Sequence, residues 1–106
     1  MFVPKLNAER QYQIYIAGEW LDSSAAEFYS NFVPAHKQQV LGLVAETTDA
    51  EVDTAMLAAE AAFPFWRGVS GNVKTKIFLQ LAQIVSARFE DFQQTMAREM
   101  GKTLFD

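Results

Sequence analysis

The amino-acid sequence predicts an α+β chain in which short strands come first and helices follow. Three observations indicate this order. Hydrophobic residues alternate with a two-residue period in the first third of the chain, the period changes to three and four after Thr47, and a helix-capping pattern stands at the change. We therefore expect an N-terminal β-hairpin and short strands, followed by two or three amphipathic helices.

The predicted hairpin spans residues 11–21. Over residues 11–16 the side chains of Tyr12, Ile14 and Ile16 alternate with those of Gln11, Gln13 and Tyr15, which is typical of a half-buried strand. Gly18 can adopt the positive φ of a tight turn, so Gly18-Glu19 predicts the turn. Trp20-Leu21 then begins the returning strand.

Two more strands are expected before the helices. Residues 28–33 are rich in aromatic and β-branched side chains and end at Pro34, which cannot donate a hydrogen bond to a sheet. We expect a loop over residues 34–39 and a strand over residues 40–44 that ends at Ala45-Glu46. Gly42 interrupts this strand, and its missing side chain would let a bulky neighbour approach closely.

The first helix is predicted from Thr48, because Thr48 and Glu51 have the spacing of a capping box. Pro64 cannot donate a helical hydrogen bond, so the last turn should kink or tighten at Phe63, and the helix should end near Gly68. Hydrophobic side chains recur at steps of three and four along it, at Val52, Ala55, Met56, Ala59, Ala62, Phe63 and Trp66.

Further helical patterns follow a break at residues 68–71. The second helix has its hydrophobic face at Ile77, Leu81, Ile84 and Val85. The third stretch has one at Phe89, Phe92, Met96 and Met100, and Gly101 is a natural C-cap. The pattern leaves open whether these two stretches form one bent helix or two.

Composition limits the function classes. Half of the 106 residues are hydrophobic, which excludes disorder from low hydrophobicity, and the net charge of −4 opposes binding to nucleic acid or to anionic membranes. The absence of cysteine removes disulfides, thiolate metal sites and cysteine nucleophiles. The apolar run Met1–Val3 is too short for a signal peptide, and no stretch approaches the roughly 20 apolar residues of a membrane span. We expect a soluble, cytoplasmic protein.

For each polar residue that could take part in catalysis, a structural role is the better explanation. His36 lies in a polar stretch without an acidic neighbour to orient it, so we expect a solvated loop histidine. Four carboxylates at the first helix start complement the helix dipole; they are Glu46, Asp49, Glu51 and Asp53. The serines lack a G-x-S-x-G elbow and a histidine partner, which rejects a nucleophile at Ser23, Ser24 or Ser70.

Glycine and lysine patterns do not predict a ligand site either. Gly68-Val69-Ser70-Gly71 matches the GXXG loop of KH domains, but it contains no basic residue and the chain is acidic. The five glycines never approach G-x-G-x-x-G or a P-loop. Lys102 follows a helix end, where a cation is favourable without any substrate. We therefore assign no catalytic, cofactor-binding or metal-binding residue.

Taken in order, these segments resemble the N-terminal segment of the aldehyde dehydrogenase superfamily. The resemblance covers the chain from about Tyr12 onward. The matching residues are Ile16-Ala17-Gly18-Glu19-Trp20, Pro34-Ala35 with Val40-Leu41-Gly42, Thr48 with Val52 and Ala55, Ala61-Ala62-Phe63-Pro64-Phe65-Trp66, and Arg98-Glu99-Met100-Gly101-Lys102-Thr103-Leu104.

The chain departs from the family pattern in two places. Val33 stands where the family commonly has asparagine, and His36-Lys37-Gln38-Gln39 replaces a shorter T-G-E turn. This longer segment resembles the semialdehyde and pyrroline-carboxylate branches. The resemblance implies oxidation of an aldehyde to a carboxylate with NAD or NADP, through a cysteine thiohemiacetal, hydride transfer and thioester hydrolysis assisted by a glutamate.

In the family, the catalytic and nucleotide-contacting motifs lie downstream of the segment that this chain resembles. We therefore expect residues 1–106 to be a truncated N-terminal part of the cofactor-binding domain, a fragment of the aldehyde dehydrogenase fold that binds no cofactor and is inactive alone. Its expected partner is the remainder of the chain or a second copy. The alternative is a small stand-alone module that binds a protein through Phe63, Trp66, Ile77 and Leu81.

Overall fold

The computed structural model describes residues 5–104 of the chain, so the Met1–Val3 stretch and Phe105 lie outside the described residues. This part of the chain contains strands β1 (Ile14–Ile16), β2 (Glu19–Leu21), β3 (Phe28–Val33) and β4 (His36–Ala45), followed by helices α1 (Asp49–Gly68), α2 (Gly71–Ala87) and α3 (Phe89–Met100). The predicted α+β class and the order of strands before helices are confirmed.

Strands β1 and β2 form the predicted antiparallel hairpin, in which Tyr15 pairs with Trp20. The predicted turn at Gly18-Glu19 is wrong by one residue: Ala17 and Gly18 form the two-residue turn, with positive φ of 52° and 87°, and Glu19 already belongs to β2. The prediction of one strand over residues 11–16 is wrong, because Tyr12 does not continue the hairpin. Its backbone N–H donates instead to the carbonyl of Leu43 in β4, at 2.8 Å.

Strands β3 and β4 form a second antiparallel pair, whose register runs from Phe28 opposite Ala45 to Val33 opposite His36. The predicted loop over residues 34–39 is wrong, because only residues 34–35 turn and β4 begins at His36. Hydrophobic alternation could not predict this extension of the strand, because the side chains of residues 36–39 are polar and exposed. The predicted close approach at Gly42 is confirmed: an added Cβ there would lie 2.7 Å from the Tyr12 ring.

The predicted capping box begins α1. The Glu51 N–H donates to Thr48 Oγ1 at 3.2 Å, and the Thr48 N–H donates to Glu51 Oε2 at 3.0 Å. The helix continues through Pro64 to Gly68, and its last turn tightens through a bond of 3.2 Å from the Val69 N–H to the Trp66 carbonyl.

The C-terminal part of the described chain forms two helices, which answers the question that the sequence left open. Helices α2 and α3 separate at Arg88, whose φ of −113° is not helical. Gly101 ends α3 in the left-handed region with φ 70°, as predicted for its C-cap.

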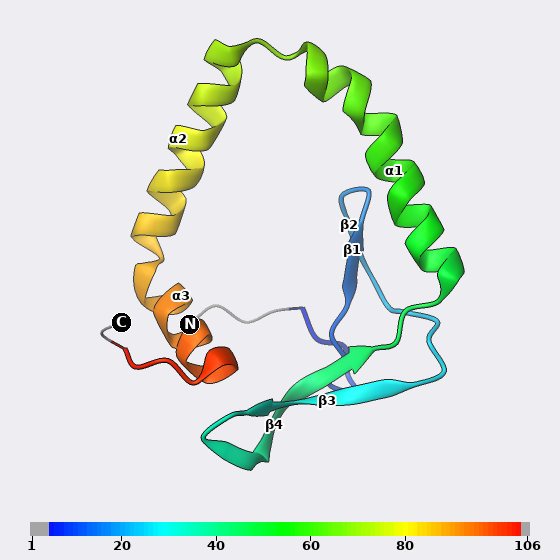
Figure 1. Cartoon of the computed structure of the whole chain (residues 1–106), viewed down its shortest axis with the longest axis vertical. Helices are drawn as coiled ribbons and strands as arrows, with labels where there is room; N and C mark the ends of the chain where they lie inside the picture. Colours follow the sequence, from blue (N-terminus) through cyan, green and yellow to red (C-terminus); the bar gives the residue numbers. More distant parts are fainter. Residues whose placement is uncertain (1–4, 105–106) are drawn as a thin grey trace.

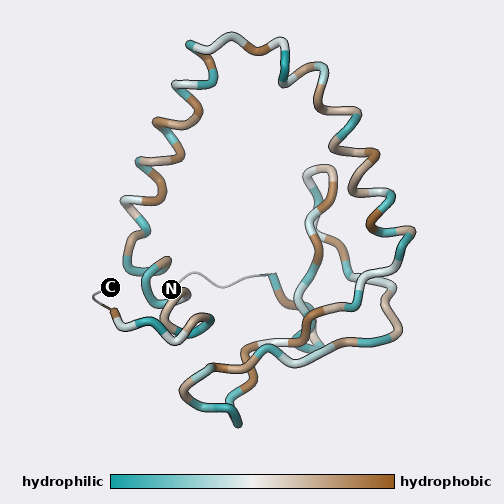
Figure 2. Tube along the Cα trace, in the orientation of Figure 1, coloured by the Kyte–Doolittle hydropathy of each residue, from teal (hydrophilic) through white to brown (hydrophobic). Residues whose placement is uncertain are grey.

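Helices α1 and α2 form an arch above the strands, with the β1–β2 hairpin beside α1 and α3 beside the β3–β4 pair (Figure 1). The radius of gyration is 17.0 Å, against about 13 Å for a compact domain of this length. Hydrophobic residues recur along the whole of both arch helices (Figure 2). Within residues 5–104, Val33 is the only hydrophobic side chain that is buried.

Candidate functional site

The densest cluster of polar contacts in the described chain surrounds the carboxylate of Glu51. The Ser23 hydroxyl donates to Oε2 at 2.8 Å, and the backbone N–H and hydroxyl of Ser24 donate to Oε1 at 2.6 and 3.1 Å. The Thr48 N–H donates to Oε2 at 3.0 Å. We call Ser23, Ser24, Thr48 and Glu51 the Glu51 node; it joins the segment after β2 to the start of α1.

These hydrogen bonds keep the Glu51 carboxyl group ionised. Hydrogen bonds from the Ser24 backbone and the Ser23 hydroxyl, assisted by Thr48, lower its pKa from 4.5 to about 2, against the opposing effect of partial burial. A carboxylate that stays charged and already accepts four hydrogen bonds does not exchange a proton near neutral pH. The Glu51 node is therefore a structural joint rather than an acid or base catalyst.

Two shallow cavities flank the Glu51 node, where β1 lies against α1. One, of about 180 Å³, is lined by Ile14, Tyr15, Ile16, Thr47, Glu51, Val52 and Ala55. The other, of about 250 Å³, is lined by Ile14, Ile16, Leu21, Asp22, Ser24, Thr48, Ala50, Glu51 and Thr54. The first is lined mainly by hydrophobic residues and the second by polar and hydrophobic residues together, and the carboxylate that they share already accepts the hydrogen bonds described above.

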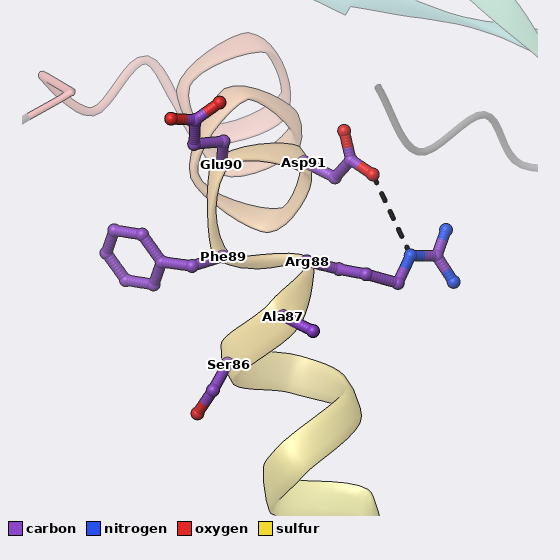
Figure 3. A pocket seen from close by; sticks show the side chains of 6 residues that line it. All are labelled: Ser86, Ala87, Arg88, Phe89, Glu90 and Asp91. Atoms are coloured by element: carbon purple, nitrogen blue, oxygen red, sulfur yellow. Dashed lines mark ion pairs between the residues drawn. The ribbon is translucent and has the colours of Figure 1, made fainter.

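A third cavity, of about 380 Å³, lies where α2 meets α3 and is lined by Ser86, Ala87, Arg88, Phe89, Glu90 and Asp91 (Figure 3). The Arg88 Nε lies 3.7 Å from Asp91 Oδ2, an ion pair between residues three apart at the start of a helix. Glu90 points away from this pair in the same view (Figure 3). The cavity thus lies at the junction between the two helices.

The structure scatters the other polar residues that the sequence singled out. His36 is exposed at the start of β4 rather than in a loop, which corrects the prediction, and Glu46 and Asp49 are exposed as well. The Ser70 hydroxyl accepts the Val73 N–H at 3.4 Å and caps α2. Within residues 5–104, no three potential metal ligands lie close enough to hold an ion.

Sequence reasoning missed the partnership of Ser23 and Ser24 with Glu51. The serines were considered only as nucleophiles, and Glu51 only as a capping residue. Some 27 or 28 residues separate the partners, so no local spacing rule connects them. The available signal was the polar stretch Asp22-Ser23-Ser24, which supplies short donors where the chain leaves β2.

A dinucleotide such as NAD binds where glycines expose backbone N–H groups at a strand-to-helix turn. The glycines of positive φ, Gly18 and Gly101, instead lie in a hairpin turn and at a helix C-terminus, where carbonyls rather than N–H groups are unpaired. Neither of these two glycines therefore forms such a turn. That the chain contains no cofactor-binding or catalytic residue stays a prediction.

None of the helices within residues 5–104 combines the length and the apolar character needed to cross a membrane.

Comparison with known proteins connects this fold to one family. The chain is 30% identical over 99 residues to an alpha-ketoglutaric semialdehyde dehydrogenase of Bacillus subtilis, covering 93% of the chain and 20% of that protein. It is 28% identical over 94 residues to the human mitochondrial methylmalonate-semialdehyde/malonate-semialdehyde dehydrogenase [acylating], covering 89% of the chain and 17% of that protein.

A 1-pyrroline-5-carboxylate dehydrogenase 2 of Halalkalibacterium halodurans is 31% identical over 93 residues, which cover 88% of the chain and 18% of that protein. The chain thus spans about a fifth of the length of the first of these relatives, and less of the others. The sequence model described as "Aldehyde dehydrogenase family" matches residues 20–106. The expected resemblance is confirmed, and the chain belongs to the aldehyde dehydrogenase family.

Proposed function

We propose that this chain is the N-terminal part of the cofactor-binding domain of an NAD(P)-dependent aldehyde dehydrogenase, and that the complete protein oxidises an aldehyde or semialdehyde to a carboxylate. Family membership supports the reaction class. The names of two relatives, both semialdehyde dehydrogenases, favour a semialdehyde substrate. In this proposal residues 1–106 supply framework and contain neither nucleophile nor cofactor site.

The observation that carries the proposal is the amount of exposed surface. The chain exposes 8405 Å², about 2,500 Å² more than a compact monomer of 11.9 kDa. One partner in a standard protein interface buries only about 800 Å². The exposed side chains include Phe63, Phe65 and Phe78, which are 58, 79 and 59% accessible. This large, hydrophobic exposed surface supports the proposal that the remainder of a dehydrogenase chain packs against these helices.

The same surface governs the behaviour of the isolated chain. Without the remainder of the protein, the arch helices gain little from hydrophobic burial, and a second copy is the available cover. The net charge of −4 supports neither a nucleic-acid nor a membrane partner. The proposal places the protein in the cytoplasm.

Activity tests the assignment directly. The 106-residue chain, mixed with NAD or NADP and a panel of aldehydes and semialdehydes, should produce no NADH or NADPH. A longer product of the same gene, with an open frame that reaches a cysteine in a glycine-rich context, should produce it from at least one of them. Turnover by the short chain alone would contradict the proposal, as would a frame that encodes no such segment.

Sedimentation tests the expected partner. The average mass of the isolated chain should rise with concentration, and its thermal transition should be broad and concentration-dependent. A monomer that melts sharply at a temperature independent of concentration would contradict this and would favour the stand-alone interaction module.

A further inference from the structure

The outer edge of β4 is covered by a segment from the start of the described chain. The Tyr12 N–H donates to the Leu43 carbonyl at 2.8 Å, and the Leu43 N–H donates to the Arg10 carbonyl at 3.0 Å. Gln11 thus lies beside Leu43 as a short parallel neighbour of β4. Hydrogen-bonded residues alternate along an antiparallel pair, so Leu43, whose two backbone groups bond away from β3, marks the outer edge of β4.

A tight turn holds this segment in place, and Asn7 closes it. The Asn7 Oδ1 accepts the N–H groups of Glu9 and Gln11 at 3.0 and 2.9 Å, and its Nδ2 donates to Gln11 Oε1 at 2.8 Å. The backbone N–H of Asn7 also donates to the Gln11 carbonyl, at 3.0 Å. We call residues 5–13 the edge cover.

Arg10 attaches the edge cover to β4 a second time. Its backbone lies in the left-handed region with φ 61°, where the turn reverses the chain. Its guanidinium donates to the carbonyls of Val40 and Leu41 at 3.4 and 3.2 Å. The Tyr12 ring comes so close to Gly42 that an added Cβ would lie 2.7 Å from it. The edge cover therefore contacts β4 through its backbone, a charged group and an aromatic ring.

The stretch of β4 beneath the edge cover is of a kind that pairs with other chains when its edge is open. Residues 40–45 read Val-Leu-Gly-Leu-Val-Ala and contain neither a charge nor a proline. Uncharged strands of this type pair edge to edge with the same segment of another copy unless something covers them. The charged residues of the chain lie outside this stretch, so two copies of it would meet without like charges between them.

We propose that the edge cover occupies the outer edge of β4 in place of a second copy of this chain, and that β4 pairs with β4 of that copy when the cover is released. Asn7 and Arg10 are the residues that hold the cover closed. The two copies would be related by a two-fold axis, because the same strand forms both sides of the pair. The edge cover precedes residues 20–106, which the family model matches, and the inference does not depend on the dehydrogenase reaction.

Hydrogen exchange of two neighbouring backbone amides tests this proposal in the 106-residue chain. The Leu43 N–H bonds to the edge cover, whereas the backbone of Val44, opposite Tyr29, faces β3. The ratio of the Leu43 rate to the Val44 rate therefore reports the cover, because unfolding of the strand pair or association through the arch helices changes both rates together. In the parent chain this ratio should be independent of protein concentration.

Two variants release the edge cover in different ways. Arg10→Gly removes the guanidinium but keeps a residue that readily adopts positive φ, so it separates the side-chain attachment from the turn. Asn7→Ala opens the turn itself. Each should raise the ratio about tenfold in dilute protein. The ratio should fall again as the concentration rises, because a second copy then protects Leu43. Glu9→Ala, an exposed change in the same turn, should leave the ratio at its parent value.

Val40→Glu tests the expected pairing, because it places a carboxylate in the uncharged stretch of both copies. Added to Arg10→Gly, it should abolish the fall of the ratio with concentration. Any of five results would overturn the proposal: a ratio that depends on concentration in the parent, no change with either cover variant, a raised ratio that does not fall at high concentration, a rise of both amide rates together in both variants, or a fall that persists with Val40→Glu.

Discussion

The strand side of the chain and the helical arch are held together differently. On the strand side, residues distant in sequence are joined by specific contacts: the Glu51 node, the Tyr12 ring over Gly42, and Arg10, whose guanidinium donates to the Leu41 carbonyl at 3.2 Å. In the arch, the described helices meet at the Lys74–Trp66 contact and otherwise diverge.

The comparison shows that hydrophobic periodicity is not the same as a core. Helices α1 and α2 contain the expected steps of three and four, yet neither has a buried residue. A periodic face predicts which side of a helix will be covered, but not whether the covering group belongs to the same chain. On the strand side, side chains contact other described residues of the same chain. The hydrophobic faces of the arch helices do not.

The largest difference should appear when alanine replaces glycine in each region. Gly42→Ala places a Cβ 2.7 Å from the Tyr12 ring and should lower the free energy of unfolding by about 1–3 kcal/mol, because the ring must move. Gly71→Ala, in open space at the first residue of α2, should raise it by about 0.4–1 kcal/mol. Urea unfolding of dilute protein measures both. Equal shifts in the same direction would break the distinction between the regions.

A smaller difference is expected when a hydrophobic side chain is shortened. Val33→Ala should cost about 2 kcal/mol, because the valine is only 7% exposed. Phe65→Ala, at a side chain 79% exposed, should change the free energy of unfolding by less than about 0.5 kcal/mol although it removes more atoms. The same urea titrations test the pair, and a larger cost at Phe65 would mean that the isolated arch is packed.

The subtlest test uses pH. The pKa of Glu51 is about 2 in the folded chain against 4.5 otherwise, so its contribution to stability is complete above pH 4.5 and is lost as the pH falls toward 2. Glu51→Gln should therefore lower the urea midpoint at pH 7, and the difference from the parent should shrink steadily as the pH falls from 4.5 toward 2.

Glu60→Gln is the matched control for this test, because Glu60 is an exposed carboxylate in the middle of α1. It should leave the midpoint almost unchanged over the same pH range. A Glu51→Gln effect that stays the same over this fall in pH would show that the amide, rather than loss of the charge, disturbs the Glu51 node.

Local patterns predicted much of this fold. The capping box at Thr48, the positive φ of Gly18 in the hairpin turn and the C-cap at Gly101 depend on neighbouring residues or on the backbone freedom of one glycine, and all three are confirmed. Each is a constraint that a few consecutive residues satisfy among themselves.

Predictions failed where a segment pairs with a distant one. Tyr12 bonds to Leu43 rather than to the hairpin, and β4 begins at His36 because the turn before it needs only two residues. Neither feature can be recognised from the hydrophobicity of the surrounding residues. For the candidate site, the sequence predicted that no residue of this chain does chemistry, but the bonds between the serines and Glu51 required the folded backbone.

The capping box of α1 has a consequence for biosynthesis. The carboxylate that closes it also binds two serines that precede it in the chain, so every group in the arrangement has been translated before the first residue of α2. Because chains emerge from the N-terminus, this joint can form on the nascent polypeptide while the helices beyond it are still being made. Helices α2 and α3 then follow a helix whose first turn is already bound to the segment after β2.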